Sequence, residues 1–113
     1  MPKGTITLIF NNKTIRVYCD KDSYCSQLGE SLRQELIYLF KTYSFDNIIA
    51  MLDKIKIGDG YNCEGSIIKM IEQGYVLNHF KEEEFNYVID FDRKTYSCYK
   101  NMFDFELSNY MKL

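Results

Sequence analysis

The sequence predicts an α+β fold, in which one antiparallel sheet of four to five strands packs two to three helices on one face. Two stretches, 5–19 and 85–99, alternate apolar and polar side chains, which indicates strands with one buried face. Between them, apolar side chains recur at helical spacing. The 113 residues suffice for one hydrophobic core, so we expect a single domain, residues 1–113.

The turn residues and the spacing of the apolar residues both predict a first hairpin over residues 5–19. Asn11 and Asn12 can form a two-residue turn, because asparagine tolerates positive φ. The pairs that this turn sets are Phe10 with Lys13, Leu8 with Ile15, and Ile6 with Val17. The last two pairs place their four apolar side chains on one face, so the hairpin is expected to contribute that face to the core.

Three helices are expected in the middle of the chain. The first covers residues 26–41 and is capped by Asp22, Ser23 or Ser26. Its buried stripe is Leu28, Leu32, Leu36, Leu39 and Phe40. The second covers 45–55 with Ser44 as its cap, and the third covers 64–73 and ends at Gly74 in a left-handed cap. Residues 57–65 contain three glycines and are expected to form a loop.

A second hairpin is predicted near the end of the chain. Residues 75–80 can form a short strand and 81–84 a charged turn. A four-residue turn over 92–95 would pair Phe91 with Tyr96 and Ile89 with Cys98, and these side chains would share a face with Tyr87. Residues 102–107 alternate again, which favours an edge strand or a docked extension.

Charge and hydropathy exclude two classes of partner. The net charge is −2, and no third of the chain has a basic excess large enough to attract a phosphate backbone, which argues against binding of nucleic acid. No apolar run approaches the roughly 20 residues that a membrane-spanning helix needs. The first ten residues alternate at once and lack a signal-peptide layout, so we expect a cytoplasmic protein.

The cysteine pattern gives no metal site and no evident catalytic site. Cys19, Cys25, Cys63 and Cys98 form no close pair, and His79 is the single histidine. Without a secretion signal we expect no disulfide, and Cys19 and Cys98 as buried thiols. Cys25 lies where a helix begins, which lowers a thiol pKa, but no base is placed beside it. We therefore predict no catalytic residue, no metal and no cofactor.

Aspartates and tyrosines supply the candidate binding residues. The core of one sheet face does not need all ten tyrosines, so we expect some of them to reach the surface: candidates are Tyr18, Tyr24, Tyr61, Tyr75, Tyr99 and Tyr110. Exposed tyrosines are enriched in binding interfaces. Tyrosine also favours strands, and an AT-rich gene would give the same bias, so both interpretations stay open. Asp22, Tyr24 and Gly29 could instead line an anion pocket at the helix start, typical of a nucleotide-type ligand site.

The segment "RVYCDKDSYCSQLGESL", residues 16–32, resembles the signature of a family of small uncharacterised phage and prophage proteins. The matching positions are Val17, Tyr18, Cys19, Asp22, Tyr24, Gly29 and Leu32 in this segment, and Tyr87, Val88, Ile89, Asp90, Asp92, Lys94, Thr95 and Tyr99 in the closing hairpin. The "IGDG" at 57–60 resembles a shared middle loop, while Ser23 and Cys25 replace the family's glycine and proline. The resemblance implies a mobile-element origin and no particular reaction.

These observations favour a non-enzymatic phage or prophage binding protein that occludes the surface of a host protein, such as one of a bacterial defence system. The candidate binding residues are Asp22 and Tyr24 first, then Tyr61, Asp90 and Tyr99. A binder of a small nucleotide-type ligand is the alternative, and a small enzyme is the third hypothesis. The expected location is the host cytoplasm, and a homodimer is compatible with the sequence.

Overall fold

The computed structural model describes residues 2–20, 22–60, 63–79, 81–100 and 111–112, and it confirms the α+β class. The elements are β1 (Gly4–Phe10), β2 (Lys13–Cys19), the π-helical turn η1 (Cys25–Gly29), α1 (Glu30–Thr42), α2 (Phe45–Asp53), β3 (Lys56–Asp59), α3 (Ile67–Gln73), β4 (Tyr75–Asn78), β5 (Phe85–Asp90), β6 (Thr95–Lys100) and β7 (Met111–Lys112). Tyr61 and the alternating stretch 102–107 lie outside the described residues. No helix in the described ranges is long and apolar enough to cross a membrane.

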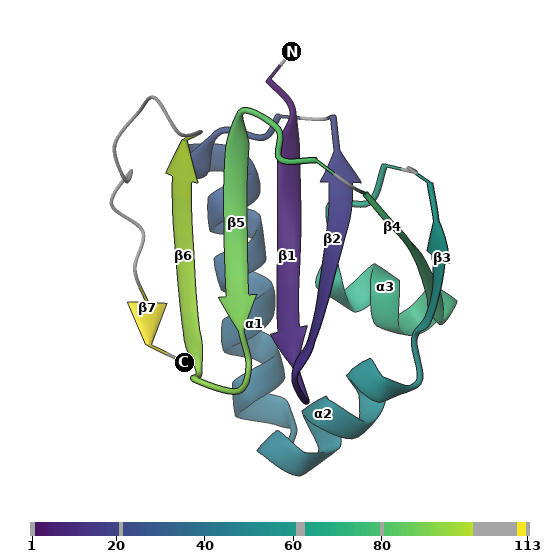
Figure 1. Cartoon of the computed structure of the whole chain (residues 1–113). Helices are drawn as coiled ribbons and strands as arrows, with labels where there is room; N and C mark the ends of the chain where they lie inside the picture. Colours follow the sequence, from purple (N-terminus) through teal and green to yellow (C-terminus); the bar gives the residue numbers. More distant parts are fainter. Residues whose placement is uncertain (1, 21, 61–62, 80, 101–110, 113) are drawn as a thin grey trace.

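The main sheet is mixed rather than antiparallel. Its order is β2-β1-β5-β6-β7, and the central pair, β1 with β5, runs parallel (Figure 1). A second, two-stranded sheet pairs β3 with β4, also in parallel. The expectation of a wholly antiparallel sheet was therefore wrong. The chain returns through β4 to the end of the sheet where β1 begins, so β5 starts beside β1 and follows its direction (Figure 1).

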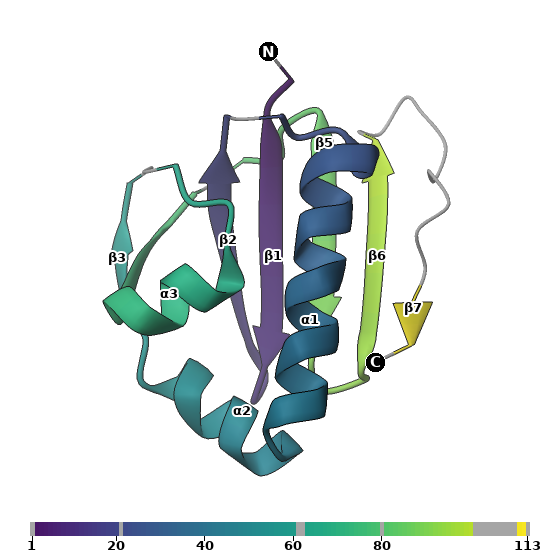
Figure 2. The ribbon, with the colours of Figure 1, turned by 180° about the vertical axis from the view of Figure 1, so that it is seen from behind.

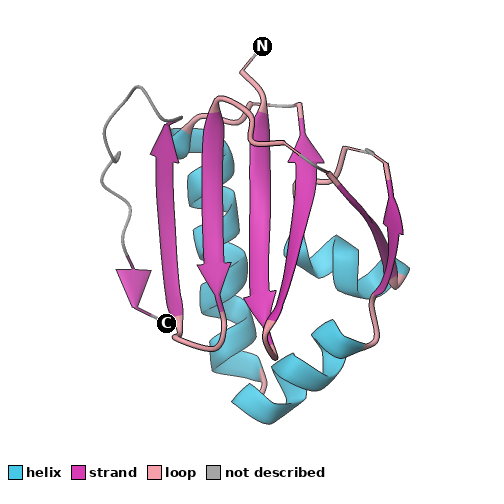
Figure 3. Ribbon diagram, viewed as in Figure 1, coloured by secondary structure: helices cyan, strands magenta, loops and turns pink. Residues whose placement is uncertain are grey.

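The helices lie on one face of the main sheet, as Figures 2 and 3 show from opposite sides. The strand side chains that face them are almost completely buried: Ile6, Leu8, Ile15, Val17, Tyr87, Ile89, Tyr96 and Cys98. From α1 the core takes Leu32, Leu36 and Leu39, which belong to the predicted stripe. Burial of apolar surface on this face is the main stabilising contribution to the fold.

The first hairpin has the predicted register. Ile6 pairs with Val17 and Leu8 with Ile15. Asn11 and Asn12 both take positive φ, 50° and 60°, as the two-residue turn requires. The turn gains a partner from the second hairpin, because the Asp92 carboxylate accepts both asparagine N–H groups at 2.9 and 3.2 Å.

The second hairpin has the predicted buried face in a different register. Tyr96 pairs with Ile89 rather than with Phe91, and Cys98 pairs with Tyr87. The turn therefore lies earlier in the chain than predicted. Within it, the backbone N–H of Arg93 donates to the Asp90 carboxylate at 3.0 Å. Side chains in a strand alternate with a period of two, so a shift of two residues leaves the same side chains buried.

The middle of the chain differs from the prediction mainly at element ends. Ser44 caps α2 as expected, while α3 starts later than predicted because Ser66 accepts the Lys69 N–H as its cap. The predicted loop at 57–65 was wrong in its first part, since residues 56–59 form β3. Gly74 ends α3 in the left-handed conformation, as predicted, with φ 76°.

We predict that Gly74→Ala lowers the free energy of unfolding by about 1 kcal/mol, because an L side chain is strained at this positive φ. A Cβ at this position would meet nothing within 4 Å, so the backbone alone accounts for the loss. Urea unfolding measures the change, and Gly74→Asn, which tolerates the conformation better, serves as the control. An alanine variant as stable as the parent would contradict the assigned cap.

Candidate functional site

The junction, residues 22–29 between β2 and α1, is held by backbone contacts rather than by the predicted side-chain cap. No side chain caps η1, and Ser23 instead donates its hydroxyl to the Cys19 carbonyl at 3.3 Å. The N–H of Leu28 donates to the Asp22 carbonyl at 3.1 Å. The junction also packs tightly on β1, since a Cβ at Gly4 would lie 2.8 Å from the Ser23 hydroxyl.

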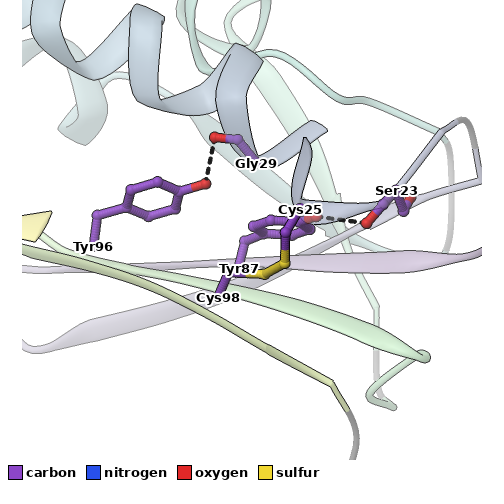
Figure 4. The surroundings of a disulfide bond; sticks show 6 residues. All are labelled: Ser23, Cys25, Gly29, Tyr87, Tyr96 and Cys98. Carbon is purple, nitrogen blue, oxygen red and sulfur yellow. Dashed lines mark hydrogen bonds between the residues drawn. A yellow bond between two sulfur atoms is a disulfide. The ribbon is translucent and has the colours of Figure 1, made fainter. Parts of the chain in front are cut away.

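Two buried tyrosines fix the junction to the sheet. Tyr87 donates its hydroxyl to the Ser23 carbonyl, and Tyr96 donates to the Gly29 carbonyl at 2.8 Å (Figure 4). Burial raises the pKa of both phenols well above the ordinary value, so both remain protonated donors at neutral pH. The two hydroxyls thus tie the backbone carbonyls of Ser23 and Gly29, near the two ends of the junction, to strands β5 and β6.

A disulfide joins the junction to β6. Cys25 and Cys98, 73 residues apart in the chain, are bonded, with their Cα atoms 6.7 Å apart (Figure 4). The expectation of no disulfide was therefore wrong, as was that of Cys98 as a free buried thiol. The expectation of no disulfide rested on the cellular compartment, whereas the fold brings Cys98 of β6, paired with Tyr87, to Cys25 of η1. In this bonded form Cys25 is not available as a nucleophile.

A cleft of about 430 Å³ opens beside the junction. Its polar lining consists of Asp22, Gln27, Ser31, Glu64, Ser66 and Lys69. The far wall is anchored to the sheet because the Glu64 N–H donates to the Tyr18 carbonyl at 3.0 Å. Glu35 of α1 accepts the Ile67 N–H at 2.8 Å and so connects α1 to the start of α3. The cleft therefore has ordered walls and can accept a small polar ligand.

Cys19 and Cys63, the two cysteines outside the disulfide, also line this cleft. The Asp20 N–H donates to the Cys63 sulfur at 3.4 Å. Burial raises the pKa of the Cys63 thiol to about 12, so the reactive thiolate is scarce at neutral pH. Within the described ranges no three His, Cys, Asp or Glu side chains are grouped so that they could hold a metal ion.

The structure separates the four predicted binding residues that it describes. Asp22 and Tyr24 lie together and exposed at the junction, where the Tyr24 ring meets the Phe85 ring edge-on at 5.4 Å. Tyr99 lies on the helix-free face and donates to the Glu82 carboxylate at 3.2 Å. Asp90 is buried at the opposite end of the sheet, as the last residue of β5, where it accepts the Arg93 N–H of the hairpin turn. Tyr61 is outside the described residues.

The sequence analysis missed two surface tyrosines on the helical layer. Tyr38 and Tyr43 are 50% and 38% exposed. Of the six tyrosines among which some were expected at the surface, Tyr24 and Tyr75 are exposed and Tyr18 is buried. Tyr38 and Tyr43 line a cavity of about 130 Å³, here called the tyrosine groove, together with Leu39, Met51, Ile68, Ile71 and Glu72. Helical spacing could have predicted the exposure of Tyr38, because Tyr38 falls outside the leucine stripe of α1.

We predict that alkylation of the unfolded, unreduced protein labels two of the four cysteines, and labels all four after reduction. Reduction should lower the free energy of unfolding by about 2–4 kcal/mol, because the bond closes a long loop in the unfolded chain. Mass spectrometry counts the labels, with Cys63→Ser as a control that removes one label. Four labels without reductant would rule out the bond.

Comparison with known proteins identifies no relative. No family model matches the chain, and no curated protein or solved structure is significantly similar to it. The resemblance to small phage and prophage proteins therefore stays a prediction from the sequence. What the chain binds has to be argued from its own surface.

Proposed function

We propose that this chain is a non-enzymatic binding protein that occludes the surface of a partner protein through the junction. The observation that carries the proposal is a half-exposed tyrosine, Tyr24, on a segment that a disulfide and two buried hydroxyls hold in place. Tyrosine brings large contact area at low entropy cost, and a preformed segment loses little further entropy on binding. Asp22 beside it would add a charged contact.

A non-catalytic role is supported by the state of the reactive side chains. Cys25 is in the disulfide, and the Cys63 thiol is held protonated by burial. His79 is buried, with its Nε2 2.8 Å from the Glu83 carboxylate. None of these pairings joins a nucleophile to a general base, so a small enzyme is the third hypothesis.

The resemblance to phage and prophage proteins supports a bacterial host protein as the partner, such as a component of a defence system. The proposed location is the host cytoplasm. The Cys25–Cys98 bond weighs against that location, because disulfides are rare in reducing compartments. A homodimer is compatible with the proposal but is not needed for it.

We predict that the immobilised protein retains a specific partner from a bacterial lysate, and that Tyr24→Ala weakens this complex at least tenfold, as expected for an aromatic anchor. Tyr75→Ala removes a comparably exposed tyrosine outside the junction and should leave binding unchanged. Affinities of the purified partner for the three proteins provide the measurement. Equal affinities, or no retained partner, would contradict the proposed surface.

A second candidate function follows from the polar cleft, whose volume of about 430 Å³ falls within the usual range for small-molecule sites. We predict that a nucleotide at saturating concentration raises the melting temperature by several degrees. Lys69→Ala should abolish the shift, because Lys69 is the basic side chain in the cleft lining. If no nucleotide stabilises the parent protein, or if Lys69→Ala responds equally, this candidate fails.

A further inference from the structure

The lining residues of the tyrosine groove come from α1, α2 and α3 and from Tyr43, which follows α1. Figure 2 shows these three helices on one side of the main sheet. The two tyrosine rings of the groove stand nearly perpendicular, at 82° with centroids 6.4 Å apart. The remaining apolar lining is Leu39, Met51, Ile68 and Ile71. At about 130 Å³ the groove is smaller than sites for whole small molecules, so its size fits one long side chain of a partner.

The charge in the groove selects the kind of side chain. Glu72 is the single carboxylate in the lining, and no ion pair neutralises it within the part of the chain described. The neighbouring Tyr38 phenol raises the pKa of Tyr43, so this ring carries no charge at neutral pH. Neutral tyrosine faces attract cations through their quadrupole, and a carboxylate adds to that attraction.

We propose that the tyrosine groove binds a lysine side chain of the partner protein. The alkyl stem of the lysine lies on the apolar lining, and its ammonium group contacts the tyrosine rings and the Glu72 carboxylate. A similar contact exists within the chain, where Lys94 Nζ lies 4.5 Å from the centroid of the Phe45 ring. The inference rests on the proposed function for the nature of the partner, but it concerns a different surface from the junction.

The test uses the 113-residue chain and two probes. One is Nα-acetyl-lysine methylamide, which has a free side-chain ammonium, and the other is the norleucine analogue, which has a similar side chain without the charge. Titration by NMR follows the backbone amide signals of Tyr38, Tyr43 and Glu72. We expect the lysine probe to bind several-fold more tightly than the norleucine probe. Glu72→Gln should remove most of this difference, and Tyr38→Ala should weaken binding of both probes. Tyr75→Ala, outside the groove, should bind as the parent does.

Equal binding of the two probes would overturn the proposal and leave a merely apolar groove. Absence of binding, or an unchanged preference for lysine in Glu72→Gln, would overturn it as well. Amide spectra of the variants show whether each remains folded, so loss of the fold is not mistaken for loss of the site. If the groove does not bind the lysine probe but Tyr24→Ala still loses the partner protein, the lysine proposal fails and the proposed function stands.

Discussion

The parallel pairing of β1 with β5 is the constraint on which the rest of the structure depends. It sets Tyr87 beside Ile6, and the second hairpin then sets Cys98 beside Tyr87. Because β5 begins at the end of the sheet where β2 finishes, both side chains lie beneath the segment that leaves β2 (Figure 4). The Tyr87 hydrogen bond to the junction follows from the β1–β5 register, and the disulfide follows from it together with the register of the second hairpin.

The junction shows how an irregular helix start can become a rigid surface. Its carbonyl groups at Ser23 and Gly29 accept hydrogen bonds from buried phenols, and the disulfide holds the backbone between them. The side chains that remain outside, Asp22 and Tyr24, are therefore presented on a fixed backbone. The tyrosine groove is a separate feature of the helical layer, so the two proposed contact surfaces are distinct.

Local chemistry determined what could be predicted from the sequence. The Asn11-Asn12 turn, the Ser44 cap and the Gly74 cap each depend on a few adjacent residues, and all three are confirmed. The parallel β1–β5 pair and the disulfide depend on contacts between residues far apart in the sequence. The spacing of apolar residues along the chain does not predict such contacts. The shifted second hairpin shows the same limit, because two registers bury the same face. At the candidate site, the exposure of Tyr24 was predictable, but its support from Tyr87 and Tyr96 was not.

The central claim is that the junction is already rigid in the unbound protein. Amide hydrogen exchange of Leu28 and Gly29 tests it most directly, since their N–H groups donate to the carbonyls of Asp22 and Tyr24. The account predicts exchange nearly as slow as in β1 for the oxidised protein, and faster exchange after reduction. Fast exchange of both amides in the oxidised protein would contradict it, because the contact surface would then form only on binding.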